Sequence, residues 1–544
     1  MLTRITGGRV IDPANNRDGV GDVWMRDGRI VDAPQGARAT ATYDAAGKIV
    51  MAGAIDVHSH IAGWNVNTAR LLLPEYHSAA AVRPATTPLS QVGWTAHETG
   101  RLYAAMGFTT VVEPAVSPQH ALHAHLELAD IPIIDKATLV ILGNDDYLLG
   151  LLRAKESGLA VQDYVAWTLE MSRSLGIKVV NAGGAAAFKE NIRAFSFDDV
   201  VPSYGLSSRA IVKALQHAVN ALGVPHPLHV HCNNLGLAGN AETALTTIAA
   251  AEGLPLHLAH LQFYGYGKEG ERDFSSAAPA LAEAVNAAKS VTIDVGQVMF
   301  GQTVTISSDV LRQFNARNQA RPGKWLILDG DANGVGVVPY NYRRNDFYNA
   351  VQWAIGLELF LLIEDPWRVF FTTDHPNGAP FTTYPEIFAL LMSRDLRSQW
   401  LAQLPPAALA VTTLSSIARE YSLTEIATMT RAAPAKLLGL ADRGHLNAGA
   451  IADVAVYENN IDRAKMFRAA ALVFKDGELV VRDGSVTNYR WGRALTVRPE
   501  RDRAIDRRMR AFYEDRYGLS EEFLKVPEHA LGRPEPFTVV PCAP

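Results

Sequence analysis

The chain has 544 residues, 48% of them hydrophobic and 20% charged, and a net charge of -5 at pH 7. This composition predicts a globular protein of more than one domain, and the small charge without a basic stripe argues against nucleic acid as a partner. Two cysteines exclude a disulfide framework and suit a reducing cytoplasm, and the lack of any run of about 18 apolar residues argues against a membrane span.

Both ends of the chain predict short strands joined by tight turns. Turn signals such as Asp27-Gly28 separate apolar pieces over residues 1–50, and Asp476-Gly477 does the same within residues 439–498. We therefore expect the two ends to form one small β-sandwich domain. Residues 499–544 are expected to be a C-terminal extension, either a solvated tail or an arm on a partner.

Residues 51–438 show a different pattern, in which short apolar runs alternate with longer segments of helical period, such as 161–175, 207–222 and 277–288. Eight such runs predict an α/β fold, a TIM-type (β/α)8 barrel. The expected strands are Ile55–His60, Thr109–Glu113, Thr138–Leu142, Ile177–Asn181, Leu228–Cys232, Leu256–Leu261, Val291–Val295 and Val369–Asp374.

Two insertions are expected in this barrel, one over 61–101 after the first strand and one over 296–366 after the seventh. A ninth apolar run, 325–328, is assigned to the second insertion. Both follow strand C-termini, the face where barrel enzymes place their sites. They are expected to build a substrate pocket or a partner surface, although decoration without a function is an equally good explanation.

The first strand ends in Asp56-Val57-His58-Ser59-His60. Side chains alternate along a strand, so His58 and His60 point to the same side, where two imidazoles can bind a metal ion. Taken alone, the pair is more simply explained as two polar residues at a strand terminus. The other strand ends must decide between these explanations.

Further candidate ligands stand at neighbouring strand ends. The fifth run contains His229 and His231, the sixth contains His257 and His260, and the eighth ends at Asp374-His375. Because the C-terminal ends of barrel strands meet at one face, these side chains are expected to converge.

Lys178 lies within the otherwise apolar fourth run. A buried lysine is costly unless it is paired or neutral. A neutral amine can take up carbon dioxide and become a carbamate, an anion whose two oxygens can bridge two cations; the alternative is a salt bridge to a carboxylate. With four histidines and an aspartate at neighbouring strand ends, the carbamate is favoured.

The set His58-x-His60, Lys178, His231, His260 and Asp374 resembles the ligands of the binuclear amidohydrolase superfamily, and the resemblance spans about residues 5–495. Three longer phrases resemble one branch, the A-type subunits of formylmethanofuran dehydrogenase and of the formyltransferase/hydrolase complex of methylotrophic bacteria. They read HVHCNNLG at 229–236, HLAHLQFYGY at 257–266 and TTDHPNGA at 372–379.

The resemblance implies a role for each ligand. His58, His60 and Asp374 would bind the more buried metal, His231 and His260 the second, and carboxylated Lys178 would bridge them. Zinc is the expected metal for both positions, although other divalent ions suit such ligands. Asp374 would also move the proton of the attacking water.

Four neighbouring residues are less certain candidates. His229 is expected to orient the metal ligands, and Asn233 is a candidate either for orienting a ligand or for contacting the substrate. His375 either orients substrate or is structural, and His257 is expected to be a core or sandwich-facing residue. Cys232 is expected to point away from the metals as a small apolar filler.

The function implied is hydrolysis of a formamide in one-carbon metabolism. A formylated amine coenzyme, formylmethanofuran or its methylotroph analogue, would give formate and the free amine. The chain would be one cytoplasmic component of a hetero-oligomeric complex that includes a formyltransferase.

Three alternatives remain open. The chain is a formate-condensing subunit of a formylmethanofuran dehydrogenase, a free-standing cyclic amidase of the hydantoinase or dihydroorotase type, or a metal-free scaffold. Retention of all six ligands argues against the scaffold.

Overall fold

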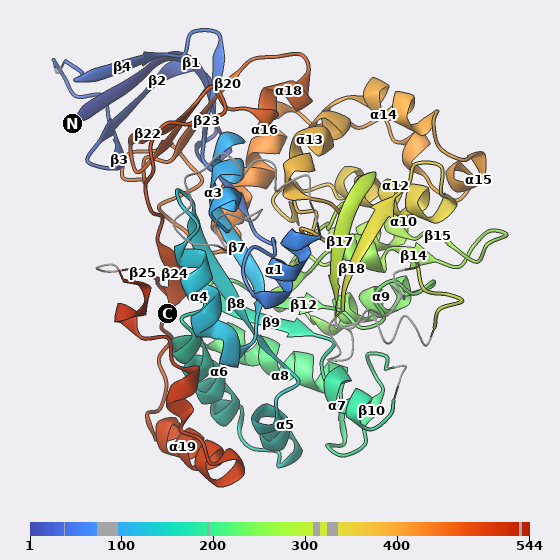
Figure 1. Cartoon of the computed structure of the whole chain (residues 1–544). Coiled ribbons are helices and arrows are strands. Elements are labelled where there is room, and N and C mark those ends of the chain that lie inside the picture. The colour runs from blue at the N-terminus through green and yellow to red at the C-terminus, as the bar shows by residue number, and fades with distance from the viewer. Residues whose placement is uncertain are drawn as a thin grey trace.

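The eight apolar runs form the eight strands of one curled, parallel sheet (Figure 1). The computed structural model describes residues 1–36, 38–72, 96–192, 195–307, 316–321, 323, 336–532 and 536–543. In order around the sheet the strands are β6 (Ala54–Asp56), β7 (Phe108–Val116), β8 (Asp135–Leu142), β9 (Gly176–Val180), β12 (Leu228–His231), β13 (Leu256–Leu258), β16 (Val291–Asp294) and β19 (Val369–Phe370). The expected barrel class is therefore confirmed.

The barrel closes between its first and last strands. Ser59 bridges His375 in parallel fashion, and the His60 N–H donates to the His375 carbonyl at 2.9 Å. β6, β13 and β19 all end earlier than the sequence predicts. His260 (φ 35°) and Asp374 (φ 51°), which lie beyond the ends of β13 and β19, have left-handed backbones, and this conformation does not continue a strand ladder.

Helices surround the sheet and follow the expected alternation. The predicted segments 161–175, 207–222 and 277–288 appear as α6 (Gly158–Ser172), α8 (Ser208–Ala221) and α10 (Ala278–Ala287). Ser157 and Ser207 cap the first two, each accepting a backbone N–H of its first turn. Other helices of the barrel region are α4 (Ala121–Ala129), α5 (Asp146–Arg153), α7 (Gly184–Lys189), α9 (Ala241–Ala250), α12 (Phe347–Leu362), α13 (Tyr384–Met392), α14 (Arg394–Leu401), α15 (Pro406–Leu409), α16 (Leu423–Ala427) and α17 (Ala433–Leu437).

The two chain ends join in one mixed sheet of nine strands beside the barrel (Figure 1). β1 (Leu2–Asp12) pairs with β4 (Ala41–Asp44) at residues 3–6 and with β5 (Lys48–Ala52) at residues 9–10, so the sheet branches there. It folds around its own apolar core, and this confirms a small β domain built from both ends. The other strands are β2 (Arg17–Arg26), β3 (Arg29–Val31), β20 (Val454–Glu458), β21 (Leu472–Lys475), β22 (Glu478–Arg482) and β23 (Ser485–Val486), with α18 (Arg463–Arg468) between two of them.

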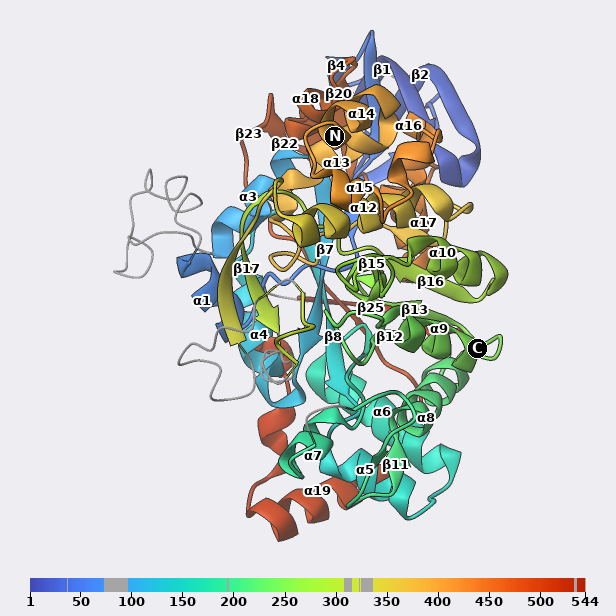
Figure 2. The same cartoon turned by 90° about the vertical axis from the view of Figure 1, so that its right-hand side faces the viewer.

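The two insertions contain the helix α1 and a β-hairpin, which lie side by side. The first carries α1 (Trp64–Leu71), followed by α3 (Ala96–Ala105), which leads into β7. The second contains the antiparallel hairpin of β17 (Gly301–Ser307) and β18 (Gly336–Tyr342), which stands beside α1 (Figures 1 and 2). The expected range 296–366 is too long, because it also takes in α12, the barrel helix between β16 and β19. The run 325–328 lies outside the described residues.

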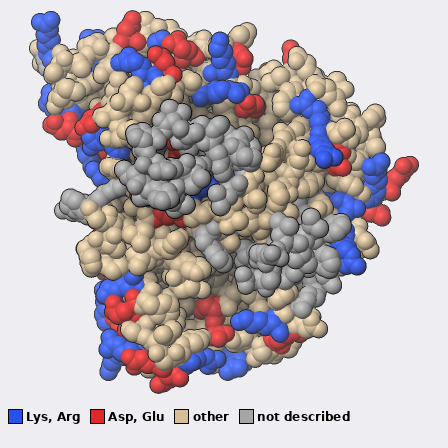
Figure 3. All heavy atoms as spheres, in the orientation of Figure 1, with Lys and Arg blue, Asp and Glu red and all other residues tan. Residues whose placement is uncertain are grey.

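The C-terminal extension packs against its own chain. β25 (Phe537–Val540) of the extension pairs with β24 (Ala494–Val497), which pairs in parallel with β8 of the barrel. β24 lies within 439–498, the range expected to belong to the β-sandwich, but it joins the barrel sheet instead. Between β24 and β25, α19 (Ala504–Tyr517) buries Ile505 and Met509. No helix in the described part of the chain is long and apolar enough to cross a membrane. The face in Figure 3 carries Lys, Arg, Asp and Glu interspersed, without a basic stripe.

Candidate metal centre

His58, His60 and Asp374 meet at the mouth of the barrel. The Asp374 Oδ1 lies 3.0 Å from the Nε2 of His58 and 3.2 Å from the Nε2 of His60. Donor atoms about 2.0–2.1 Å from one zinc ion in a tetrahedral site are roughly 3.3 Å apart. Three side chains from the first and last strands therefore present atoms at spacings that fit a single metal ion.

His231 and His260 form a second pair of donors beside the first group. The His231 Nδ1 and the His260 Nε2 are 3.1 Å apart, and the His260 ring lies 5.3 Å from that of His58. Burial keeps the pKa of His260 well below its usual value, so this imidazole is neutral, as a metal ligand must be. The spacing of the two nitrogens suits two ligands of one metal ion.

Lys178 faces the interior of the barrel. It is aligned with His229 on the adjacent strand β12, and paired residues on neighbouring strands share a face. The side chain is buried, and its Nζ makes no ion pair with any carboxylate of the described residues. Burial lowers its pKa to about 8, against the opposing influence of the more distant Asp294 and Asp374. A neutral amine, the form that reacts with carbon dioxide, is thus within reach near neutral pH.

Two buried carboxylates outside the predicted set hold the ligands. The Glu113 Oε1 lies 3.2 Å from the Nδ1 of His60, and its Oε2 accepts the backbone N–H groups of Ile61 and Ala62. The Asp294 Oδ2 lies 3.0 Å from the Nδ1 of His58. Each interrupts an otherwise apolar strand run, the same signal that singled out Lys178. Carboxylates in this position fix the ring and tautomer of a metal-binding histidine.

Of the remaining candidate residues, His229 contacts a ligand, and the others pack in the core or hold loops. His229 Nε2 contacts the His58 Nδ1 at 3.0 Å, whereas His257 lies in the barrel core with its Nε2 3.0 Å from the Asp294 Oδ2. The Asn233 amide donates to the Phe195 carbonyl and to Ser208, and so holds a loop. His375 accepts the Phe381 N–H, and Cys232 is buried, which raises the pKa of its thiol to about 12.

Charge in the site is concentrated on Asp374 and His60. Burial opposes the charged form of both, but the two groups stabilise each other. The pKa of Asp374 stays well below its usual range because His260 and His58 face it. The facing carboxylates of Asp374 and Glu113 raise the pKa of His60 to about 9. A divalent cation would take the place of the His60 proton as the partner of the carboxylate.

Buried polar atoms without a hydrogen-bond partner indicate where a metal ion would fit. Neither the His58 Nε2 nor the Asp374 Oδ1 has a hydrogen-bond partner in the described part of the chain, although both are buried. Such atoms are costly in a protein interior unless something satisfies them. A cation between them would satisfy both, so the residues present fit a metal ion.

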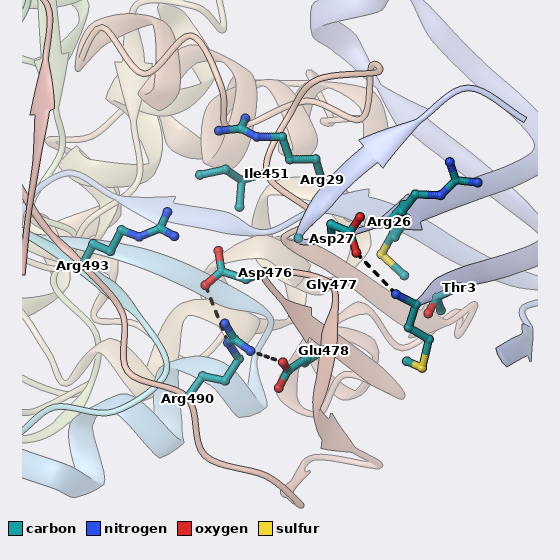
Figure 4. Close-up of a pocket in the computed structure, with 13 residues that line it drawn as sticks. Thr3, Arg26, Asp27, Arg29, Ile451, Asp476, Gly477, Glu478, Arg490 and Arg493 are labelled. Atoms are coloured by element: carbon teal, nitrogen blue, oxygen red, sulfur yellow. Dashed lines mark hydrogen bonds and ion pairs between the residues drawn. The ribbon is translucent and has the colours of Figure 1, made fainter. Parts of the chain in front are cut away.

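A separate cavity lies between the small sheet and the edge of the barrel, away from these residues (Figure 4). It has a volume of about 520 Å³, and none of the candidate ligands lines it. Its acidic side chains are paired within the cavity: Asp27 with the N-terminal amine, and Asp476 and Glu478 with Arg490. The cavity therefore has no part in the chemistry at the barrel mouth.

Comparison with known proteins places the chain among its relatives. A model of the amidohydrolase family matches residues 41–487. The chain is 51% identical to the A-type subunit of the formyltransferase/hydrolase complex Fhc of Methylorubrum extorquens, over 98% of this chain and 97% of that one. It is 39% identical to the protein FwdA of Methanocaldococcus jannaschii, over 91% and 90%. It also shares 44% identity with a dihydroorotase of Desulfotalea psychrophila, but over only 11% of this chain and 15% of that one.

Solved structures agree with the sequence relatives. A chain of the FhcABCD complex of Methylorubrum extorquens, crystallised with methylofuran, superposes with a TM-score of 0.93 at 50% identity over the whole of both chains. A zinc-containing N-acyl-D-glutamate deacylase of Bordetella bronchiseptica, 18% identical, shares the fold with a TM-score of 0.51 over 89% of this chain and 98% of that one. The chain therefore belongs to the amidohydrolase family, close to the A-type subunit of the formyltransferase/hydrolase complex.

Proposed function

We propose that this chain hydrolyses the formamide of a formylated amine coenzyme of the methylofuran type to formate and the free amine. It would do so as one component of a complex that also contains a formyltransferase. The observation that carries the proposal is the convergence of His58, His60 and Asp374 on one point, in a chain 51% identical to the A-type subunit of an Fhc complex.

His58, His60 and Asp374 would hold one divalent ion, and His231 with His260 the other. Carboxylated Lys178 would bridge the two, and zinc is the metal we expect. Divalent metals at such a site lower the pKa of a bound water and polarise a carbonyl oxygen. The spacings of 3.0–3.2 Å between donor atoms support this assignment.

Asp374 is the residue we assign to proton transfer. Its carboxylate takes the proton of the attacking water, and it gives that proton to the nitrogen as the carbon–nitrogen bond breaks. Because the pKa of Asp374 is held well below its usual range, the group begins the cycle as a base. The bond formed is between carbon and the water oxygen, and the bond broken is the carbon–nitrogen bond. The products are a neutral amine and formic acid, which releases its proton to solvent as formate.

The test is an assay of the complex purified with its own partner subunits. Formylated coenzyme extracted from the same cells should yield stoichiometric formate, and the activity should disappear when metals are removed by a chelator and return with Zn²⁺. Release of no formate by metal-loaded complex would contradict the proposal. Identification of the co-purifying subunits by mass spectrometry checks the expected formyltransferase partner.

A cyclic amidase is the second candidate, and the short match to dihydroorotases favours it. The same preparation should be offered hydantoin and dihydroorotate. Ring opening without deformylation would establish this alternative. A formate-condensing subunit of a dehydrogenase is the third, supported by the weaker identity to FwdA. Tungsten or molybdenum in the co-purified complex would favour it.

A further inference from the structure

We propose that Asp294 is a positioning residue that joins the two halves of the candidate metal centre and selects the tautomer of His58 that can bind metal. The inference rests on the metal centre in the proposed function, but not on the identity of the substrate. Asp294 was outside the residues expected from the sequence to act at the site.

The two oxygens of Asp294 reach both halves of the site. Its Oδ2 lies 3.0 Å from the His58 Nδ1, on the side of the ring opposite to the atom that faces Asp374. Its Oδ1 accepts the backbone N–H of His260 at 2.6 Å. His260 has a left-handed backbone (φ 35°), and this hydrogen bond stabilises that turn. One fully buried carboxylate thus orients a ring in one half and a backbone in the other.

The ionised Asp294 determines which nitrogen of His58 carries the proton. A carboxylate can only accept, so the proton of a neutral His58 must sit on Nδ1, and Nε2 keeps its lone pair. Nε2 is the atom 3.0 Å from the Asp374 Oδ1, where the metal is expected. His257 gives a second N–H to the same Oδ2 from its Nε2, at 3.0 Å. The His58 N–H adds to these hydrogen bonds only in the tautomer that leaves Nε2 free to bind metal, so the charge of Asp294 favours that tautomer.

The charges around Asp294 agree with this account. Burial alone would raise the pKa of Asp294, but the facing His58 and His257 rings hold it far below its usual range. Burial also lowers the pKa of His257 and His229, so both are neutral imidazoles. The carboxylate is therefore ionised and accepts hydrogen bonds from its neighbours.

His58, His229 and Asp294 also have donor atoms close enough to hold a cation of their own. Hydrogen bonds already account for these atoms: the His58 N–H serves both the Asp294 Oδ2 and the His229 Nε2, each at 3.0 Å. We therefore expect two metal ions per chain. A third tightly bound ion per chain, measured by elemental analysis, would assign these atoms to metal binding and overturn the tautomer role.

The decisive variant is Asp294→Asn, which changes no heavy-atom geometry. The His260 N–H can only donate, so the amide oxygen must face it and the NH₂ group must face His58. That NH₂ group repels an N–H on the His58 Nδ1 and on the His257 Nε2, both of which face the Oδ2 position. The His58 tautomer with its proton on Nε2, the lone pair that should bind metal, is therefore favoured. We expect metal affinity to fall about 10–100-fold, with the fold retained.

Asp294→Ala separates tautomer selection from a merely structural role. Without the carboxylate, the His229 Nε2 can still accept the His58 Nδ1–H, so the binding tautomer stays available. If Asp294 is only structural, Asn should be nearly harmless and Ala severe. If it selects the tautomer, Asn should bind metal more weakly than Ala, although the Asn variant is the more stable protein.

The measurements are zinc affinity by chelator competition and the thermal midpoint of each metal-free variant. Wild-type zinc affinity in the Asp294→Asn variant would overturn the inference. The proposed function fails in a different way, because wild-type protein would then bind two metals and release no formate. Zinc affinity therefore decides the role of Asp294 whether or not the substrate is correct.

Discussion

At the scale of single residues, Lys178 bears the most specific chemical expectation. Its Nζ is buried without an ion pair among the described residues, and burial lowers its pKa to about 8. The missing ion pair argues against the salt bridge that was the alternative, and the lowered pKa increases the fraction of neutral amine, the species that forms a carbamate.

Replacing Lys178 with Ala should abolish metal binding and activity together, because the bridging anion is lost. Short carboxylic acids such as acetate or propionate should restore part of both, since they can occupy the space of the carbamate. Elemental analysis and formate release measure the two effects. Lys189→Ala, an exposed lysine on α7, is the matched control and should behave as wild type. Full turnover in Lys178→Ala would rule out the carbamate.

Much of the candidate site could be predicted at this scale, because polar residues interrupt otherwise apolar strand runs. His58, His60, Lys178 and Asp374 all gave that signal, and the structure brings them to one barrel mouth. Asp294 gave it as well, but its sequence context does not say whether a carboxylate touches metal or orients a ligand. That distinction depends on which oxygen faces which ring, and only the folded geometry supplies it.

At the scale of elements, the hairpin β17–β18 is connected to Asp374, the carboxylate to which we assign proton transfer. The Ile306 N–H of the hairpin donates to the Asn377 Oδ1 at 2.7 Å. Because that contact fixes the amide, the Asn377 NH₂ group must face Asp374, and it donates to Oδ2 at 2.8 Å. The hairpin therefore sets the orientation of Asp374 through one side chain.

Ile306→Pro removes the N–H and should lower kcat by about tenfold or less, the worth of one hydrogen bond, with little change in KM. The proline is tolerable because this N–H points out of the two-stranded ladder. Ile306→Ala keeps the N–H and loses only apolar contact, so its kcat should exceed that of the Pro variant.

A double-mutant cycle with Asn377→Ala completes the test. If the hairpin acts through Asn377, the two losses in kcat should overlap rather than add. Fully additive losses would show that the hairpin and Asn377 act independently, and this would contradict the connection.

The hairpin and its neighbour α12 also show where element prediction fails. α12 is buried on nearly every side, so it has no polar stripe and its helical period is invisible in the sequence. For this reason the predicted insertion 296–366 includes α12, although α12 is a helix of the barrel. For α8, which has one solvent-exposed face, the predicted range 207–222 agrees with the observed helix within one residue at each end.

At the scale of the whole molecule, a buried ionic cluster fixes the small sheet to the barrel. Lys475 of β21 contacts Asp135 of β8 at 3.0 Å and Asp453 at 2.8 Å, and Arg443 contacts Asp135 at 3.0 Å. All four side chains are buried. Both chain ends show short apolar strands separated by turn signals, and this shared pattern predicts that they pair. The ionic cluster could not be predicted, because its members are distant in sequence.

Lys475→Met should lower the free energy of unfolding by about 3–5 kcal/mol, because it leaves buried carboxylates without their cation. The same substitution at Lys48, whose partner Glu458 is exposed, should cost about 0–1 kcal/mol. Denaturant unfolding of the three proteins measures both values. Neither residue lies in the candidate metal centre, so zinc affinity should not change.

The pH dependence of this difference identifies its cause. Burial opposes both charges, but Lys475 and Arg443 depress the pKa of Asp135, while Asp135 and Asp453 raise that of Lys475. The lowered carboxyl pKa stabilises the fold above about pH 4, and this contribution disappears as pH falls through the folded value. The raised amine pKa stabilises the fold below about pH 10.4, and that contribution disappears as pH rises through its folded value. Burial raises the pKa of Asp453, and Lys475 opposes that increase, so this carboxyl titrates above its usual range and contributes to the acid side. The stability gap between wild type and Lys475→Met should therefore be largest on the alkaline side of neutral, below about pH 10, and narrow at both extremes. A gap independent of pH would instead attribute the loss to packing of the lysine stem.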